Sequence, residues 1–87
     1  MDGRVVTQRG RERAANEARA LGMGRTMMKV LSGFPEDDIW NMAFSEHLEI
    51  HHNCPCCKGS QINARLVSDH IRSLLKDYPM DPTRSSC

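Results

Sequence analysis

Glycine and proline residues divide this chain of 87 residues into four segments, and these breaks limit how long any helix in it can be. The breaks are Gly22, Gly24, Gly33, Pro35 and Pro55. Glycine ends helices because it adopts the left-handed conformation without strain, and proline is tolerated in the first turn of a helix. We therefore expect four helices, formed by a basic stretch that ends at Leu21 and by residues 25–31, 35–52 and 60–76.

The third and fourth segments begin with residues that favour a helix start. Three acids at positions 36–38 follow Pro35 and complement the positive end of a helix dipole. Ser60 can cap the fourth helix with its hydroxyl group. Pro79 and Pro82 limit residues 79–87 to an irregular tail, so we expect one domain over residues 1–78.

The composition favours packed helices over strands. The chain has only two Phe, one Trp and one Tyr but six Met, whereas strands are typically rich in aromatic and β-branched residues. We therefore expect an all-α fold. A chain of this length buries only about 60% of the surface of its unfolded state, so a metal ion or another cross-link would help it to fold.

Three of the four histidines lie on the expected apolar faces of the third and fourth helices. At 100° per residue, His47 and His51 share an arc with apolar residues of the third helix, and His70 lies on an arc that also holds Ile62 and Leu66. A buried neutral imidazole must satisfy two ring nitrogens, which is costly without partners. A metal ion would supply such a partner.

The sequence CPCCKG follows these histidines closely and predicts one structural zinc ion. Cys54 and Cys57 have the Cys-x-x-Cys spacing that lets two thiolates meet a tetrahedral Zn²⁺, and Gly59 permits a tight turn. With four protein ligands the site would be closed, which is typical of structural zinc and not of catalytic zinc. In the alternative interpretation, these cysteines and histidines are buried without a metal.

Two ligand sets satisfy this interpretation. The preferred set is His51, Cys54, Cys57 and His70, because His70 would tie the fourth helix to the third. His47 is the reserve fourth ligand, and with it all four ligands would lie within residues 47–57. In either case residues 35–78 would form a zinc-bound helical hairpin. This His-rich helix before a Cys-x-x-Cys pair resembles the zinc sites of anti-sigma factors.

Residues 14–33, AANEARALGMGRTMMKVLSG, resemble a helix-turn-helix of bacterial and phage DNA-binding proteins. Ala18 stands where that motif needs a small residue, and Gly22 stands at its turn. The apolar positions of the motif are filled by Leu21, Met23, Met28 and Leu31. The resemblance implies that residues 25–31 are the recognition helix and that residues 4–33 contact DNA. An ordinary helical hairpin with a solvated arginine face is the alternative.

The resemblance also implies which side chains contact DNA. Arg25, Thr26 and Lys29 would point outward from the recognition helix toward bases and phosphates. Flanking phosphates would be held by Arg9, Arg11 and Arg13. The charge pattern agrees, because residues 1–34 have seven Arg and Lys against three acids, while residues 35–52 have five acids and no Arg or Lys.

The sequence therefore predicts a small zinc-binding, DNA-binding regulator of transcription. The alternative is a protein-binding module that docks on RNA polymerase or a sigma factor without contacting DNA. The sequence is also compatible with a homodimer. No catalytic constellation is present, so we expect no enzyme activity. No apolar run approaches the ~18 residues that cross a bilayer, and the N-terminus lacks the core of a signal peptide, so we expect a cytoplasmic protein with no membrane partner.

Overall fold

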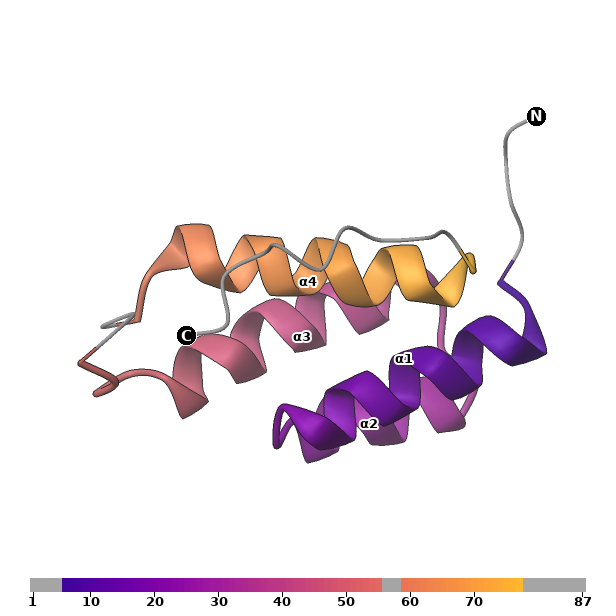
Figure 1. Ribbon diagram of the computed structural model, residues 1–87, viewed down its shortest axis with the longest axis horizontal. Helices are drawn as coiled ribbons and strands as arrows, with labels where there is room; N and C mark the ends of the chain where they lie inside the picture. Colours follow the sequence, from indigo (N-terminus) through magenta and orange to yellow (C-terminus); the bar gives the residue numbers. More distant parts are fainter. Residues whose placement is uncertain (1–5, 56–58, 78–87) are drawn as a thin grey trace.

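The computed structural model describes residues 6–55 and 59–77 and folds them into four α-helices (Figure 1). They are α1 (Gln8–Ala20), α2 (Gly24–Leu31), α3 (Glu36–Ile50) and α4 (Gln61–Leu75). The all-α fold class and the four helices expected from the sequence are confirmed. Within the described residues, no helix combines the length and the apolar character needed to span a membrane.

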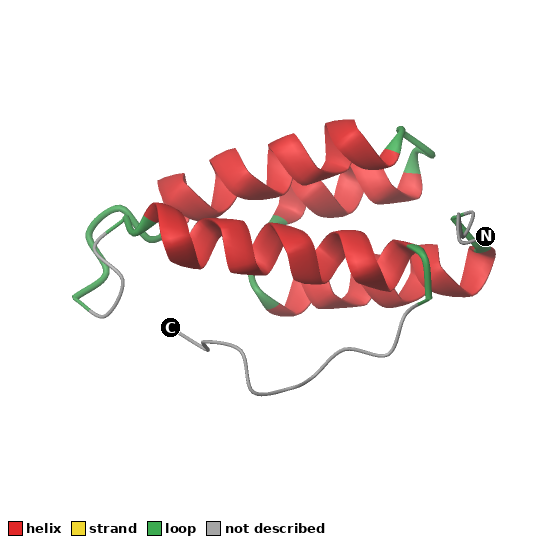
Figure 2. Cartoon of the chain, turned by 90° about the horizontal axis from the view of Figure 1, so that it is seen from above, coloured by secondary structure: helices red, strands yellow, loops and turns green. Residues whose placement is uncertain are grey.

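Successive helices run in opposite directions and form a four-helix bundle (Figures 1 and 2). α1 packs against α2 and α4, and α3 packs against the same two helices. Short connections between antiparallel neighbours are typical of such bundles. As a result, α1 lies beside α4, the last helix in the part of the chain that the structure describes.

The helix ends follow local chemistry that the sequence already showed. The hydroxyl of Ser60 accepts the backbone N–H of Asn63 and caps α4, as predicted. Gly22 and Gly33 follow α1 and α2 with φ angles of 75° and 80°, a conformation that favours glycine. These contacts fix where the helices begin and end.

The core consists mainly of small and medium-sized apolar side chains. α1 contributes only alanines, Ala14, Ala15 and Ala18, which allow α2 and α4 to approach it closely. The larger core residues come from the rest of the chain and include Met23, Val30, Ile39, Val67, Ile71, Leu74 and Leu75. The core therefore contains little side-chain volume on the α1 side.

α1 meets the end of α4 at a backbone-to-backbone contact. Gly10 is buried there, and a Cβ atom at this position would overlap the carbonyl oxygen of Leu75. The backbone N–H of Thr7 donates to that same oxygen at 3.3 Å. Glycine is thus required at position 10 because the two main chains leave no room for a side chain.

α3 and α4 project beyond α1 and α2 at the end that carries the loop between them (Figure 1). Ile62 and Leu66 lie near this end and are exposed, Ile62 by 72%, although both fall on the expected apolar arc of α4. The apolar arc continues to the start of α4, whereas the shorter helix α1, which packs against α4, covers only part of its length. Helical periodicity alone does not show where along α4 the packing of α1 ends.

Candidate functional site

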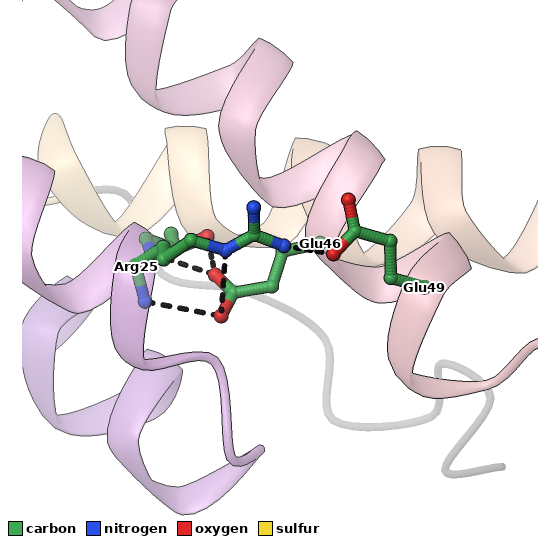
Figure 3. A network of polar contacts seen from close by, with 4 residues as sticks. Arg25, Glu46 and Glu49 are labelled. Carbon is green, nitrogen blue, oxygen red and sulfur yellow. Dashed lines mark hydrogen bonds and ion pairs between the residues drawn. The ribbon is translucent and has the colours of Figure 1, made fainter.

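The first turn of α2 is capped by a carboxylate from α3 (Figure 3). Glu46 is only 5% exposed, and its Oε1 accepts both the backbone N–H and the hydroxyl of Thr26 at 2.7 Å. Its Oε2 accepts the backbone N–H of Arg25 at 3.0 Å. Met23, the residue before α2, offers no side-chain acceptor. Glu46 therefore supplies both the acceptor and the negative charge that the start of a helix favours.

This cap changes the expected roles of two residues. Thr26, predicted to point outward toward DNA, is fully buried instead, because its hydroxyl and its N–H both face Glu46. The Arg25 side chain reaches α3, where it hydrogen-bonds to Glu49 and places its Nε 3.9 Å from Glu46 Oε2 (Figure 3). Arg25 remains 54% exposed, so part of its guanidinium still faces solvent.

The other predicted DNA contacts also interact within the protein. Arg11 donates to the carbonyl oxygen of Val30 at 2.9 Å, and Arg13 forms an ion pair with Asp77. The Nζ of Lys29 lies 3.9 Å from the centroid of the Phe34 ring. Arg9 lies 4.0 Å from Asp77 and is the most exposed of these arginines, at 78%.

α1 and α2 lie side by side as an antiparallel hairpin (Figures 1 and 2). In a DNA-binding helix-turn-helix the two helices cross at about 90–120°. α2 is also packed against α3 along its other side. The structure thus shows a small four-helix domain, and the arrangement of α1 and α2 is that of an ordinary helical hairpin.

An open groove of about 660 Å³ lies between α2 and α3. Its apolar lining comes from Met27, Met28 and Met42, and it also includes Gly24, Arg25, Lys29 and Glu46. We call this feature the methionine groove. Met28 is 56% exposed, and Leu31 and Phe34, which do not line the groove, are exposed apolar side chains as well. Methionine side chains are flexible and polarizable, so they adapt to differently shaped partners.

Sequence reasoning missed this groove because it forms only when α2 and α3 pack together. The sequence assigned Met28 to the interior of a helix-turn-helix, whereas the structure exposes it. The available signal was the pair Met27 and Met28 in a short helix, followed by Met42 in the next. Spacing within one helix does not show that these side chains line a common surface.

A histidine pair lies at the end of α3, as part of the predicted metal site. His47 is buried, and the centroid of its ring lies 4.3 Å from that of His51. Burial, and after it the charge of His51, lowers the pKa of His47 below its ordinary value. Its Nδ1 is buried and has no hydrogen-bond partner among the residues that the structure describes. Burial therefore favours the neutral form of His47, and its Nδ1 lacks a partner within this part of the chain.

The loop after α3 folds back onto His51. The carbonyl oxygen of His51 accepts the N–H of Cys54 at 3.1 Å and that of Gly59 at 2.9 Å. Gly59 has a φ of 71°, which explains the glycine at this turn. Both ends of the segment containing the Cys-x-x-Cys pair are thus held beside His51, while Cys57 itself lies outside the described residues.

His70 lies elsewhere on the bundle. Its Nε2 is 3.4 Å from Oε2 of Glu17 on α1. At about 1.5 Å per residue, His70 is roughly 13 Å along α4 from Gln61, where the helix leaves the loop. The structure does not bring His70 to His51 and Cys54. Over residues 6–55 and 59–77, no group of three or more His, Cys, Asp or Glu side chains is placed to hold a metal ion.

No protein-family model, curated protein or solved structure shows significant similarity to this chain. Its function is therefore inferred from its own surfaces and side chains. The most distinctive of these is the methionine groove, followed by the histidine pair at the loop between α3 and α4.

Proposed function

We propose that this chain is a protein-binding module that holds a helical segment of a partner protein in the methionine groove. The observation that carries the proposal is an open, methionine-lined groove in which Met28 is 56% exposed. Amphipathic helices commonly bind by laying their apolar face in such a groove, and methionine-rich surfaces suit this role. RNA polymerase and sigma factors, the partners in the alternative hypothesis from the sequence, are the first to assay.

The polar contacts of α2 also favour protein docking over DNA reading. A recognition helix presents its first turn to base edges, but here Thr26 is buried and Arg25 is bound to two acids of α3. Lys29, the third predicted contact, lies over Phe34. The side of α2 that remains open to solvent is mainly apolar.

The docking function can be tested by NMR of the full chain with ¹³C-methyl-labelled methionine. The probe is a synthetic amphipathic peptide of about 18 residues, or five helical turns, with leucines along one face. Methyl resonances of Met27, Met28 and Met42 should shift on titration. Met23 is 1% exposed and is the control that should stay unchanged. A titration that leaves all three groove methionines unmoved would reject the function.

DNA binding is the second candidate, and it is favoured by the 78% exposure of Arg9 and the partial exposure of Arg25. It predicts duplex binding that weakens steeply with salt and weakens further in Arg9→Ala and Arg25→Ala. Fluorescence anisotropy across a salt series measures this. Absence of binding at low salt, or binding indifferent to both substitutions, would leave protein docking as the surviving candidate.

We also propose one structural zinc ion at the loop between α3 and α4, held by His47, His51, Cys54 and Cys57. The unsatisfied Nδ1 of buried His47 and the ring of His51 beside it support this local set. His47 replaces His70 in this proposal because His70 pairs with Glu17 on α1.

A further inference from the structure

We infer that the segment bound in the methionine groove is an amphipathic helix whose apolar face is flanked by acidic side chains. The inference rests on the docking function proposed above and adds the chemistry of the partner. It follows from the charges that line the groove and from the exposed apolar side chain beside Lys29.

Three ionisable residues line the groove, and the carboxylate of the acid among them is bound to the first turn of α2. Glu46 is 5% exposed, and both of its carboxylate oxygens accept hydrogen bonds from the first turn of α2. Its charge is therefore balanced by the start of that helix and by the nearby Arg25. The two ionisable groups left at the rim, Arg25 and Lys29, are both cations.

The two cations differ in how far their charge is already balanced. Arg25 is bound to Glu49, an acid that is itself largely exposed. Lys29 has no acidic partner among the described residues, and its Nζ lies 3.9 Å from the centroid of the Phe34 ring. A cation over an aromatic ring keeps its full charge. Lys29 is thus the cation at the groove that an incoming carboxylate would meet.

The charge of Lys29 lies beside an exposed apolar side chain. Phe34, the ring beneath Lys29, is exposed, and Met28 and Leu31 on the neighbouring helix α2 are exposed as well. Residues three or four apart in a helix are neighbours on its surface, so a partner helix can present a leucine and a glutamate to adjacent points. A helix of this kind would place its leucine on an exposed apolar side chain and its carboxylate near Lys29.

The experiment compares two synthetic helical peptides that share the same leucine face and differ only in flanks of Glu or of Lys. They are titrated at low salt into the full chain with ¹³C-methyl-labelled methionine. Wild-type protein should bind the Glu peptide about five-fold more tightly, because a single exposed ion pair changes the dissociation constant a few-fold. Lys29→Glu should remove or reverse this preference.

Arg65→Glu is the matched control, since Arg65 is exposed on α4 and the substitution makes the same change in net charge away from the groove. It should keep the preference for the Glu peptide. If Lys29→Glu lowers helicity by circular dichroism, Lys29→Gln takes its place and should remove the preference.

Four results would contradict the inference. Equal binding of both peptides would reject the acidic flank. A preference for the Glu peptide that survives substitution of Lys29 would reject Lys29 as the cation that meets the carboxylate. Both results would leave the docking function intact. Shifts of the groove methionines on raising the protein concentration alone would show that a second copy of the chain occupies the groove. No shift with either peptide would reject the docking function itself, and the inference with it.

Discussion

Glu46 and Thr26 are joined by two hydrogen bonds of 2.7 Å, one to the backbone N–H of Thr26 and one to its hydroxyl. The two residues belong to different helices, so a side chain of α3 determines how α2 begins. Because both donors are buried, the carboxylate is their only acceptor among the described residues. This pair couples the helix that forms one wall of the methionine groove to the helix that forms the other.

Glu46→Ala should destabilise the protein by about 1 to 3 kcal/mol, because it leaves buried donors of Thr26 without a partner. Glu46→Gln keeps one acceptor oxygen and should cost less. Urea unfolding of the variants measures the loss. Glu49→Gln is the control, since Glu49 is exposed and should change the free energy of unfolding only slightly. An equal effect at positions 46 and 49 would show that the cap contributes little.

Gly10→Ala should destabilise the bundle by about 1 to 3 kcal/mol, since the added methyl group would overlap the main chain at Leu75 and force α1 away from α4. Gly24→Ala is the matched control, because a Cβ atom there meets nothing within 4 Å. It should be neutral or stabilising by up to about 1 kcal/mol. Thermal unfolding compares the two, and a Gly10→Ala protein as stable as wild type would contradict the close approach.

Stability should fall in acid through the ion pairs of Glu36. Burial alone raises the pKa of Glu36, but hydrogen bonds from Arg72 and Lys76, at 2.7 and 3.0 Å, outweigh it and lower the pKa. A lowered pKa in the folded state gives stability that is present above the pKa of the unfolded chain, about 4.3 for Glu, and is lost as the pH falls through the folded value.

Urea unfolding at neutral pH and across the acid range measures this loss. Glu36→Gln removes the titrating group, so the stability of this variant should change less than that of wild type between neutral and acid pH. The same substitution should lower stability at neutral pH, where the wild-type carboxylate is ionised. An identical pH dependence in the two proteins would assign the acid sensitivity to other groups.

One zinc ion per chain is expected in protein purified without added metal, and elemental analysis measures it. Cys54→Ser should lose the metal and unfold much of the chain, because structural zinc contributes on the order of 10 kcal/mol in small domains. Cys87→Ser, which changes a cysteine outside the proposed set, should keep both the zinc ion and the fold. Metal-free wild-type protein that is fully folded would rule the site out.

His47→Asn and His70→Asn distinguish the two ligand sets. Competition with a chelator should show strongly weakened zinc binding in His47→Asn only. His70→Asn should instead affect stability through the contact of His70 with Glu17. Selective loss of zinc in His70→Asn would restore the set that the sequence alone favoured.

The helices could be predicted from the sequence because their ends depend on residues close by. Gly22, Gly33 and Ser60 act through their own backbone conformation or through a residue three positions away. The same local reasoning placed His47 and His70 in the interior, where the structure has them.

The side-chain partners could not be predicted, because they come from other helices. Thr26 was expected at the surface, but its partner Glu46 is 20 positions away. The carboxylate 3.4 Å from the Nε2 of His70 belongs to Glu17, on a helix far earlier in the chain. Helical periodicity gives the face on which a residue lies, and it does not give the neighbour that this face meets.

The contact of Thr7 and Gly10 with Leu75 has a consequence for how the molecule assembles. It joins two ends of the described chain, so the loop it closes contains the whole bundle, and closing a long loop costs conformational entropy before any contact repays it. During synthesis α1 emerges before α4, and the part of its alanine face that packs against α4 stays open to water until α4 has been made. Closure of this seam is therefore expected to be late in folding, and mutations confined to it should mainly accelerate unfolding and have little effect on the folding rate.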